Sequence, residues 1–499
     1  VSTIAKKYDT LNAAEYKALC QKVGLDVNAL GNADTDWQDE IFRTSVSTNH
    51  SISMQGGLKD MPYRVSLGYN IDNGIVKTSY MRRFNSSFNI APSFLNNHLN
   101  FNITGKYMAE KDRYADAGGA IGSALSIDPT RPVYLDPSSP YYNTFGGYYN
   151  AGKAAEGKNA AWPYEANTNA PQNPVALLNF KHTYAHTDDF SGNVEMDYKV
   201  HGFEDLRIHG NVGAQYTASR QTDDIDKCSF SNNYYGWNGL ERYYKYNVVG
   251  NVYAEYAHKF GIHNVDVMGG AEQSHYHRSG FSFGQGTDPY SGAAYNVSTR
   301  NQTQWATHNS LVSYFGRLNY TLLDRYMLTA TFRADGSSRF SKDNRWGYFP
   351  STALAWKINQ ENFLRSANWL DELKLRLGWG ITGQQDINGD FLYSSVYTVS
   401  NSYAMQQFGD TYYYTMRPSA YNPDLKWEQT TTYNAGLDFS AFNGRVTWSL
   451  DYYYRKTKDL INTVAIPVGT NFSDKVTKNI GSLKNYGLEF STDVKPIVT

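Results

Sequence analysis

The stretch LVSYFGRLNYTLLDRYMLTATFRAD, residues 311–335, decides the fold of this chain. Apolar or aromatic residues alternate with polar ones before and after a short connection at 323–325, and LKLRLGWGIT, residues 373–382, repeats the pattern. Because successive side chains of a β-strand point to opposite faces, each stretch predicts a strand with one apolar and one polar face. The pattern therefore indicates antiparallel hairpins with only one apolar face.

Two tryptophans in the neighbouring WGYFPSTALAW, residues 346–356, indicate what the apolar face meets. Trp346 and Trp356 share one face and lie ten residues apart, which is roughly 33 Å along a strand and roughly 25 Å of height at a tilt of about 40°. That height matches the lipid-facing band between the two aromatic girdles of an outer-membrane barrel. A soluble sandwich shows the same alternation with its apolar face inward, but gives no reason for this spacing. We therefore expect an all-β fold, a transmembrane antiparallel up-and-down β-barrel.

The composition agrees with strands rather than helices in the membrane. The 499 residues are 41% hydrophobic with a mean hydropathy of -0.58, and no run of about 18 apolar residues occurs, which excludes a bundle of membrane helices. The 42 Tyr, 24 Phe and 10 Trp fit strands and aromatic girdles. A net charge of -1, without a basic block, argues against nucleic acid as a partner.

Long and short connections alternate along almost the whole chain. Short turns are expected at 201–205, 260–264 and 323–325, long loops at 222–242 and 283–304, and very long loops at 110–179 and 384–427. The sequences Asp72-Asn73-Gly74 and Asn443-Gly444 each predict a tight turn. Outer-membrane barrels have short periplasmic turns and long extracellular loops, so the alternation predicts about fifteen strands with all long loops on one side.

Several longer motifs carry a resemblance to a known family. They are DWQDEIFRT (36–44), FRADGSSRF (332–340), RWGYFPSTALAW (345–356), LKLRLGWGITGQQDI (373–387), NPDLKWEQT (422–430), DYYYRKTKDLI (451–461) and NIGSLKNYGLEF (479–490). In this order they resemble the SusC/RagA-type TonB-dependent outer-membrane transporters of Bacteroidetes.

The resemblance implies a 22-strand barrel, an N-terminal plug with a TonB box, and a SusD-like surface lipoprotein that lids the extracellular mouth. It also implies import of oligosaccharides or peptides energised through TonB, in a dimer of transporter–lid pairs. We expect residues 1–499 to be only a part of such a barrel, with the plug, the TonB box, the signal peptide and the last strands outside this chain. The expected location is the outer membrane of a Gram-negative, Bacteroidetes-like bacterium, in contact with outer-membrane lipid and lipopolysaccharide.

Aromatic residues gathered in the long loops are the candidate substrate-binding residues. They are Tyr141, Tyr142, Tyr148, Tyr149, Trp162, Tyr164, Tyr234, Tyr235, Trp237, Tyr412, Tyr413 and Tyr414. Flat rings with polar edges suit sugar rings and peptide backbones. The alternative is that these rings pack the loops against each other or against the lid protein.

Charged residues on the polar strand faces are expected to line the lumen, where they pair with each other or with the plug. They are Arg317, Arg333, Asp335, Lys374, Arg376, Asp451 and Arg455. The chain shows no Ser-His-Asp set, no paired-carboxylate spacing and no phosphate loop, so we expect no enzyme.

The sequence contains one partial calcium-loop pattern. Asp386, Asn388 and Asp390 resemble part of a calcium loop, but Gly389 is out of register and Tyr397 stands where a Glu ligand belongs. We expect no cofactor, with structural calcium in an extracellular loop as the alternative.

Two other residue pairs leave alternatives open. His275 and His277 share a strand face but have no third metal ligand nearby, which favours girdle or lumen histidines. Cys20 and Cys228, both expected in loops, form one disulfide in an oxidising compartment or remain unpaired.

Two other functions remain open at this stage. A siderophore or cobalamin receptor would use a similar barrel without a lipoprotein lid. A surface protein that binds glycans without transport is the third possibility, although the alternation of long and short loops speaks against it.

Overall fold

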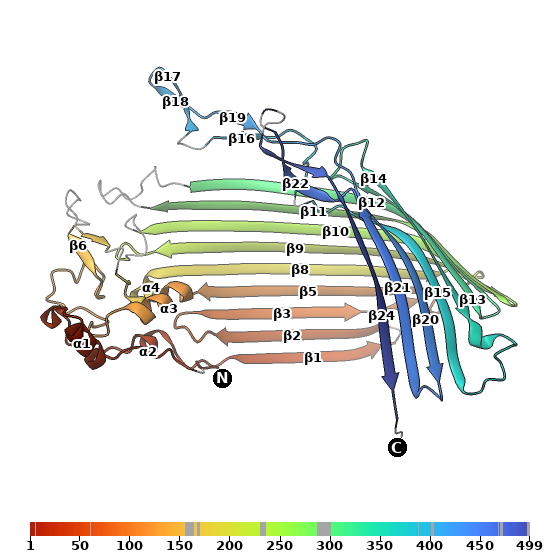
Figure 1. Ribbon diagram of the computed structural model, residues 1–499, viewed down its shortest axis with the longest axis horizontal. Coiled ribbons are helices and arrows are strands. Elements are labelled where there is room, and N and C mark those ends of the chain that lie inside the picture. The colour runs from red at the N-terminus through yellow and green to blue at the C-terminus, as the bar shows by residue number, and fades with distance from the viewer. Residues whose placement is uncertain are drawn as a thin grey trace.

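One antiparallel sheet of 16 strands runs through the whole chain (Figure 1). The computed structural model describes residues 1–4, 6–59, 61–154, 164–166, 170–229, 236–286, 301–387, 389–400, 404–467, 469 and 473–496. Along the sheet the strands are β1 (Thr48–Leu58), β2 (Met61–Asn73), β3 (Tyr80–Ile90), β5 (Leu99–Tyr114), β8 (Lys181–Lys199), β9 (Leu206–Ile225), β10 (Trp237–Phe260), β11 (His263–Gly286), β12 (Asn301–Leu322), β13 (Tyr326–Ser337), β14 (Trp346–Lys357), β15 (Leu370–Gln384), β20 (Glu428–Ala441), β21 (Val446–Lys458) and β24 (Ser482–Val494), with β4 (Ser93–Phe94) paired to β5.

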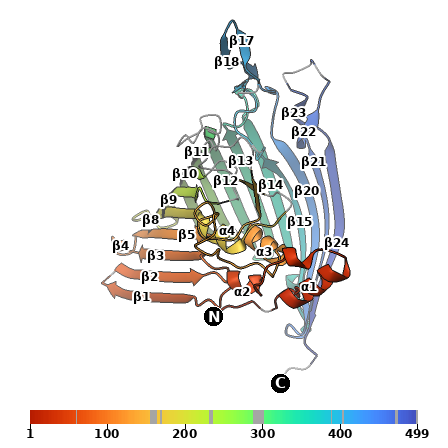
Figure 2. The same cartoon turned by 90° about the vertical axis from the view of Figure 1, so that its left-hand side faces the viewer.

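The sheet has the up-and-down order that the sequence predicts. Each strand of the path pairs antiparallel with the path strand that follows it in the chain, and β1 and β24 form the two edges. The sheet is curved like part of a barrel wall (Figure 2). The predictions of an all-β class, of up-and-down topology and of about fifteen strands are confirmed.

Short helices and hairpins lie in the connections between the strands of the sheet, most of them at one end. The helices are α1 (Ala13–Lys22), α2 (Trp37–Ile41), α3 (Ala117–Ser126) and α4 (Pro174–Phe180), with short helical turns η1 (Val27–Ala29) and η3 (Ile358–Gln360). Four small hairpins pair β6 (Gly152–Ala154) with β7 (Tyr164–Ala166), β16 (Tyr397–Val399) with β19 (Met416–Pro418), β17 (Gln406–Phe408) with β18 (Thr411–Tyr413), and β22 (Ile461–Ala465) with β23 (Lys475–Asn479). Within the described residues, no helix combines the length and the apolar character needed to cross a membrane.

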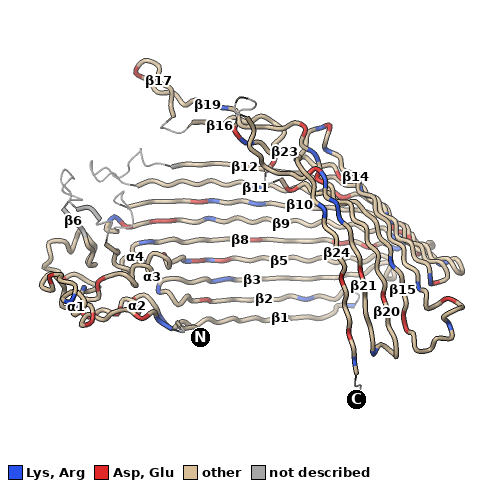
Figure 3. Tube along the Cα trace, in the orientation of Figure 1, with Lys and Arg blue, Asp and Glu red and all other residues tan. Residues whose placement is uncertain are grey.

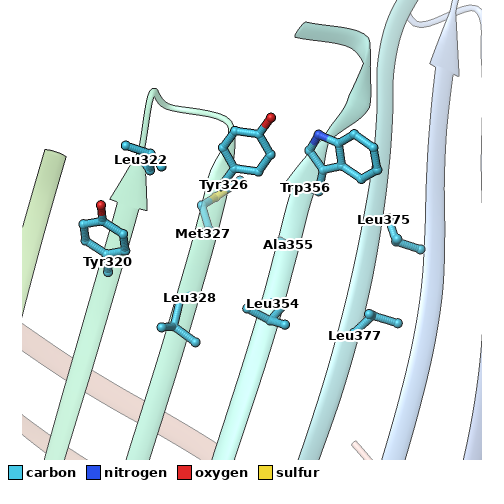
Figure 4. Close-up of a pocket in the computed structure, with 10 residues that line it drawn as sticks. All are labelled: Tyr320, Leu322, Tyr326, Met327, Leu328, Leu354, Ala355, Trp356, Leu375 and Leu377. Atoms are coloured by element: carbon cyan, nitrogen blue, oxygen red, sulfur yellow. The ribbon is translucent and has the colours of Figure 1, made fainter. Parts of the chain in front are cut away.

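One face of the sheet is apolar and exposed, and we call it the outer face. Trp346 stacks on Tyr314 with ring centroids 6.1 Å apart, and Trp356 stacks on Tyr326 at 6.3 Å. Between these aromatic pairs the face carries leucines from β12 to β15, which line a shallow apolar groove with Tyr320 and Trp356 (Figure 4). The two tryptophans therefore share the apolar face, as the sequence predicts. We call the opposite, polar face the luminal wall.

Connection lengths alternate from strand to strand. The connections β8–β9, β10–β11 and β12–β13 are short and lie at one end, here called the turn end, whereas those after β5, β9, β11 and β15 lie at the loop end. The tight turn at Asn443-Gly444 is confirmed, with Gly444 at φ 73°. The tight turn predicted at Asp72-Asn73-Gly74 is wrong. Strand β2 continues to Asn73, and Arg43 holds the longer connection by donating to the carbonyl oxygens of Gly74 and Ser79 at 3.0 and 2.8 Å.

Loops at the loop end build a small core of their own. Trp37 of α2 packs with Ala120 and Ala124 of α3 and with Leu178 of α4, and its Nε1 donates to the Asp128 carbonyl oxygen at 3.1 Å. The expected loop 110–179 is thus partly helical. Its AGGAIGSALS segment carries too few large apolar residues to show a helical period.

The connection before β1 contains helix α1 near the N-terminus. Asn12 and Glu15 form a reciprocal capping box that satisfies its first backbone N–H groups. Cys20 lies in this helix, within the connection before β1 where it was expected, and is buried. Cys20 and Cys228 are both free thiols, and of the two alternatives the unpaired one holds.

Candidate functional site on the luminal wall

Ion pairs cover the luminal wall, as the sequence predicts. Arg333 lies 3.0 Å from Glu272 and 2.7 Å from Asp335. Arg376 reaches Asp438 at 2.7 Å and Asp451 at 3.0 Å. Two of the remaining predicted cations also pair with carboxylates, Arg317 with Glu255 and Lys374 with Asp438. Arg455 instead lies over the ring of Tyr453.

Three aromatic rings gather on this wall toward the loop end, and we call Trp237, Tyr243 and Trp305 the aromatic platform. Tyr243 and Trp305 have ring centroids 6.2 Å apart at an interplanar angle of 48°. They border a hollow of about 320 Å³, and Trp237 borders a second hollow of about 200 Å³ beside it. Both hollows share the polar residues Gln221, Glu241 and Ser282.

Glycines on β11 let the indole rings lie against the sheet. A Cβ atom at Gly280 would lie 2.5 Å from the ring of Trp305, and a Cβ atom at Gly284 would lie 2.2 Å from the ring of Trp237. Such distances are too short for any larger residue unless the ring moves. The rings are therefore positioned by the strand itself, next to hydrogen-bonding side chains, which is the composition of a sugar- or peptide-binding surface.

Sequence reasoning found only one member of this platform. Trp237 was expected in a loop, but β10 begins there and places it on the wall. Tyr243 and Trp305 were not singled out, because they lie inside β10 and β12 and strand aromatics are common. The sequence signal for the platform was the pair of glycines at 280 and 284, whose missing side chains leave room for the rings of Trp305 and Trp237.

The tyrosines of the β5–β8 connection separate into packed and exposed residues. Tyr148 stacks edge-on against Phe180 at 5.0 Å and accepts from Asn179 Nδ2 at 2.9 Å. Burial raises the pKa of Tyr148 and of Tyr149. Tyr141 stacks on Phe145 and remains exposed to solvent. Tyr148 and Tyr149 therefore pack the loop, as in the alternative reading of these rings, and Tyr142 lies half-buried beside Gly147.

Tyr412, Tyr413 and Tyr414 lie on and beside the β17–β18 hairpin. All three are more than half exposed. The hairpin projects beyond the sheet at the loop end (Figure 1; Figure 2). The hairpin is a two-stranded sheet of its own, separate from the 16-stranded sheet that carries the aromatic platform.

The remaining candidates receive little or no description. Tyr164 lies in β7, and only its backbone is described. Trp162, Tyr234 and Tyr235 lie outside the described residues.

The residues considered for metal binding have protein partners. Asp386 lies 2.8 Å and Asp390 lies 3.1 Å from the guanidinium of Arg339, and Asp390 also accepts from Thr307. Asn388 is outside the described residues. No group of three or more metal-ligating His, Cys, Asp or Glu side chains occurs in the described part of the chain.

The histidine pair lies on the outer face beyond the aromatic pairs. His277 stacks on Tyr246 at 4.8 Å, and His275 Nδ1 is 2.8 Å from Ser310 Oγ. Both rings are thus held by neighbours on the same face.

A family model described as "TonB dependent receptor-like, beta-barrel" matches residues 113–495. The chain belongs to this family. TonB-dependent receptor barrels lie in the outer membrane, so the loop end of this barrel is extracellular and the turn end is periplasmic.

Individual relatives agree with the assignment to TonB-dependent receptors. The TonB-dependent receptor SusC of Bacteroides thetaiotaomicron is 56% identical over the whole chain, which covers 50% of SusC. The TonB-dependent receptor P26 of Formosa agariphila is 30% identical over 93% of the chain and 45% of P26. The chain thus spans about half the length of these relatives.

A solved structure described as the RagAB peptide transporter has the same fold. It superposes with a TM-score of 0.73 at 20% identity, over 98% of this chain and 57% of that chain. The resemblance to SusC- and RagA-type barrels that the sequence motifs indicate is therefore confirmed.

Proposed function

We propose that the protein containing this chain imports oligosaccharides or peptides across the outer membrane, with a SusD-like lipoprotein as lid and TonB as energy source. The observation that carries this proposal is the 56% identity to SusC along the entire chain. The platform supports it, because Trp237, Tyr243 and Trp305 offer flat apolar faces beside Gln221 and Glu241 at the extracellular end of the lumen.

The proposed lid has a matching surface. The β17–β18 hairpin carries Tyr412, Tyr413 and Tyr414 away from the sheet, and exposed tyrosines are enriched in protein interfaces. In this proposal the hairpin contacts the lipoprotein, and the platform receives substrate released beneath the lid. The ion-paired luminal wall below the platform would face the plug, through which TonB acts in this class of transporter.

Growth of the source bacterium tests the proposal. The gene is deleted and then restored on a plasmid, either unchanged or with substitutions. Each strain is supplied with a defined oligosaccharide or a defined peptide as the sole nutrient of its class. Replacing Tyr243 and Trp305 together by alanine should lower uptake at limiting substrate by about tenfold or more, since each aromatic contact contributes about 0.5–1.5 kcal/mol beyond its buried area. The matched control replaces Trp346 and Tyr348, which face lipid, by alanine.

The outcomes separate the alternatives. Loss of growth on one nutrient class only would name the substrate class. Normal growth of the deletion strain on every glycan and peptide, together with failure under iron or cobalamin limitation, would replace the proposal by a siderophore or cobalamin receptor.

A further inference from the structure

Four Arg or Lys side chains and one histidine form one row across five neighbouring strands, and we call them the cationic row. The row consists of Arg82 on β3, Lys111 on β5, His186 on β8, Arg220 on β9 and Arg242 on β10. Each is the direct cross-strand partner of the next: Arg82 pairs with Lys111, Lys111 with His186, His186 with Arg220, and Arg220 with Arg242. Directly paired residues have Cβ atoms about 4.5–5.5 Å apart, and like charges in that position destabilise a sheet.

The row lies on the outer face. All five side chains are exposed, and they share strand parity with exposed apolar residues such as Phe84, Phe190 and Val212. From the periplasmic side, the outer-face positions of β3, β5 and β9 carry no charged residue until Arg82, Lys111 and Arg220 are reached. On each of the three strands, the first charge on the outer face therefore belongs to the row.

Aromatic residues mark the membrane boundary just below the row. Tyr107, Phe190, Tyr216 and Tyr246 are direct partners across β5, β8, β9 and β10, four residues nearer the periplasm than the row on each strand. Four residues are roughly 13 Å along a strand, and less in height because the strands tilt. Since aromatic girdles sit at the headgroup level, the row lies in or just above the outer-leaflet headgroups. Lys and Arg occur on β3, β5, β9 and β10 in the parts nearer the loops (Figure 3).

The cations of the row lack the partners that luminal cations have. On β3, Arg83 faces the lumen and pairs with Glu110, whereas its neighbour Arg82 lies over the ring of Tyr80 at 5.0 Å. In the described part of the chain, no carboxylate pairs with Arg82, Lys111, Arg220 or Arg242. Two acids lie beside the row. Asp188 lies 3.0 Å from His186 Nε2 and accepts from Tyr107 Oη at 2.6 Å, and the buried Asp112 is next to Lys111 in the chain.

A hollow of about 350 Å³ opens at the middle of the row. It is lined by Lys111, His186 and Arg220 of the row together with Tyr80, Asp112, Tyr184, Ala185 and Thr222, and Asp112 is the one carboxylate of this lining. Cationic groups thus meet hydroxyl groups and two tyrosine rings around one depression. Arg and Lys bind phosphate oxygens strongly, and tyrosine rings stack against sugar rings.

We propose that the cationic row binds the phosphate groups of the phosphorylated glycolipid of the outer leaflet, the lipid A part of lipopolysaccharide. The extracellular position, the outward direction and the unpaired positive charge all fit this occupant. The bound phosphates cancel the repulsion within the row and fix the lipid in register with β3–β10. The proposal rests on the outer-membrane location alone and holds whatever the barrel imports.

Lipid binding to the intact, detergent-purified protein tests the site. The probes are lipid A, dephosphorylated lipid A, phosphatidylglycerol and inorganic phosphate, each titrated and followed by native mass spectrometry. The test variant combines Lys111→Gln with Arg242→Gln. The control combines Lys106→Gln with Lys245→Gln, which removes the same charge from the luminal side of the same two strands.

The unmodified protein and the control should bind lipid A equally and more tightly than the other three probes. The test variant should bind it about 25-fold more weakly, at about fivefold for each charge removed near an anionic lipid surface. Equal lipid A affinity of the test variant and the control would overturn the proposal. So would equal binding of dephosphorylated lipid A, binding of inorganic phosphate as tight as that of lipid A, or loss of a protein partner instead of lipid. A gel shift on boiling confirms that each variant is folded, and uptake by the test variant remains at the control level.

Discussion

Single residues decide where the luminal rings can lie. Gly280 is paired directly with Trp305, and no side chain fits between the strand and the indole ring. The sequence predicted the strand around Gly280 from alternation, but the close approach of the ring depends on a neighbouring strand. Such contacts between β11 and β12 are set by register, which the sequence of either strand alone does not show.

Gly280→Ala should push the indole ring of Trp305 off the wall. We expect faster hydroxyl-radical oxidation of Trp305, read by mass spectrometry, and weaker uptake at limiting substrate. The control is Gly269→Ala on the same strand, where the nearest atom to a new Cβ is 3.9 Å away. Unchanged oxidation of Trp305 in Gly280→Ala would show that the ring does not lean on this glycine.

The thiol of Cys228 should be unreactive at neutral pH. Burial raises its pKa to about 11, and nearby Asp226 adds to the effect. A thiol reacts as its thiolate, so at pH 8 the reactive fraction is about 100-fold smaller than for a thiol of pKa 9, and it grows as the pH rises toward 11. Iodoacetamide labelling followed by mass spectrometry should be slow at pH 8 and rapid after denaturation. Equally fast labelling before and after denaturation would contradict the partly buried position of Cys228.

At the scale of elements, the strands were more predictable than the structures at the loop end. Strands such as β13 and β21 show a period of two because one face meets lipid and the other water. The α2–α4 core shows no such period. It joins Trp37 from before β1 to residues of the β5–β8 connection, so its contacts are distant in sequence. The aromatic candidates in these loops were identified by composition, which does not separate packing rings such as Tyr148 from exposed rings such as Tyr413.

Removing the central ring of this core should loosen the loops and spare the barrel. Trp37 is 3% exposed, and a Trp→Ala change at such a site costs about 3–5 kcal/mol. Trp37→Ala should make the β5–β8 connection sensitive to protease added to whole cells, while the barrel still shifts on boiling. Trp369→Ala, in the periplasmic β14–β15 connection, serves as the control and should leave the connection resistant. Protease resistance equal to that of the unmodified protein would show that α2–α4 do not depend on this core.

At the scale of the whole molecule, the alternation of connection lengths placed the long loops after β5, β9, β11 and β15 at one end, whereas the connection after β2 was wrongly predicted as a tight turn. The parity reflects topology, because an up-and-down sheet returns to the same side after every second strand. The alternation of connection lengths does not show what the sheet surrounds. In this chain β1 and β24 are the two unpaired edges of the sheet. Backbone groups within lipid require hydrogen-bond partners, so we expect both edges to be paired in the membrane.

Purification of the intact protein from outer membranes in mild detergent tests the central claim most directly. The identity and stoichiometry of co-purifying proteins are read by mass spectrometry, with the Tyr412, Tyr413 and Tyr414 triple alanine variant in parallel. The account predicts one SusD-like surface lipoprotein per barrel, reduced in the triple variant. A barrel that purifies alone in repeated preparations would contradict the lidded importer.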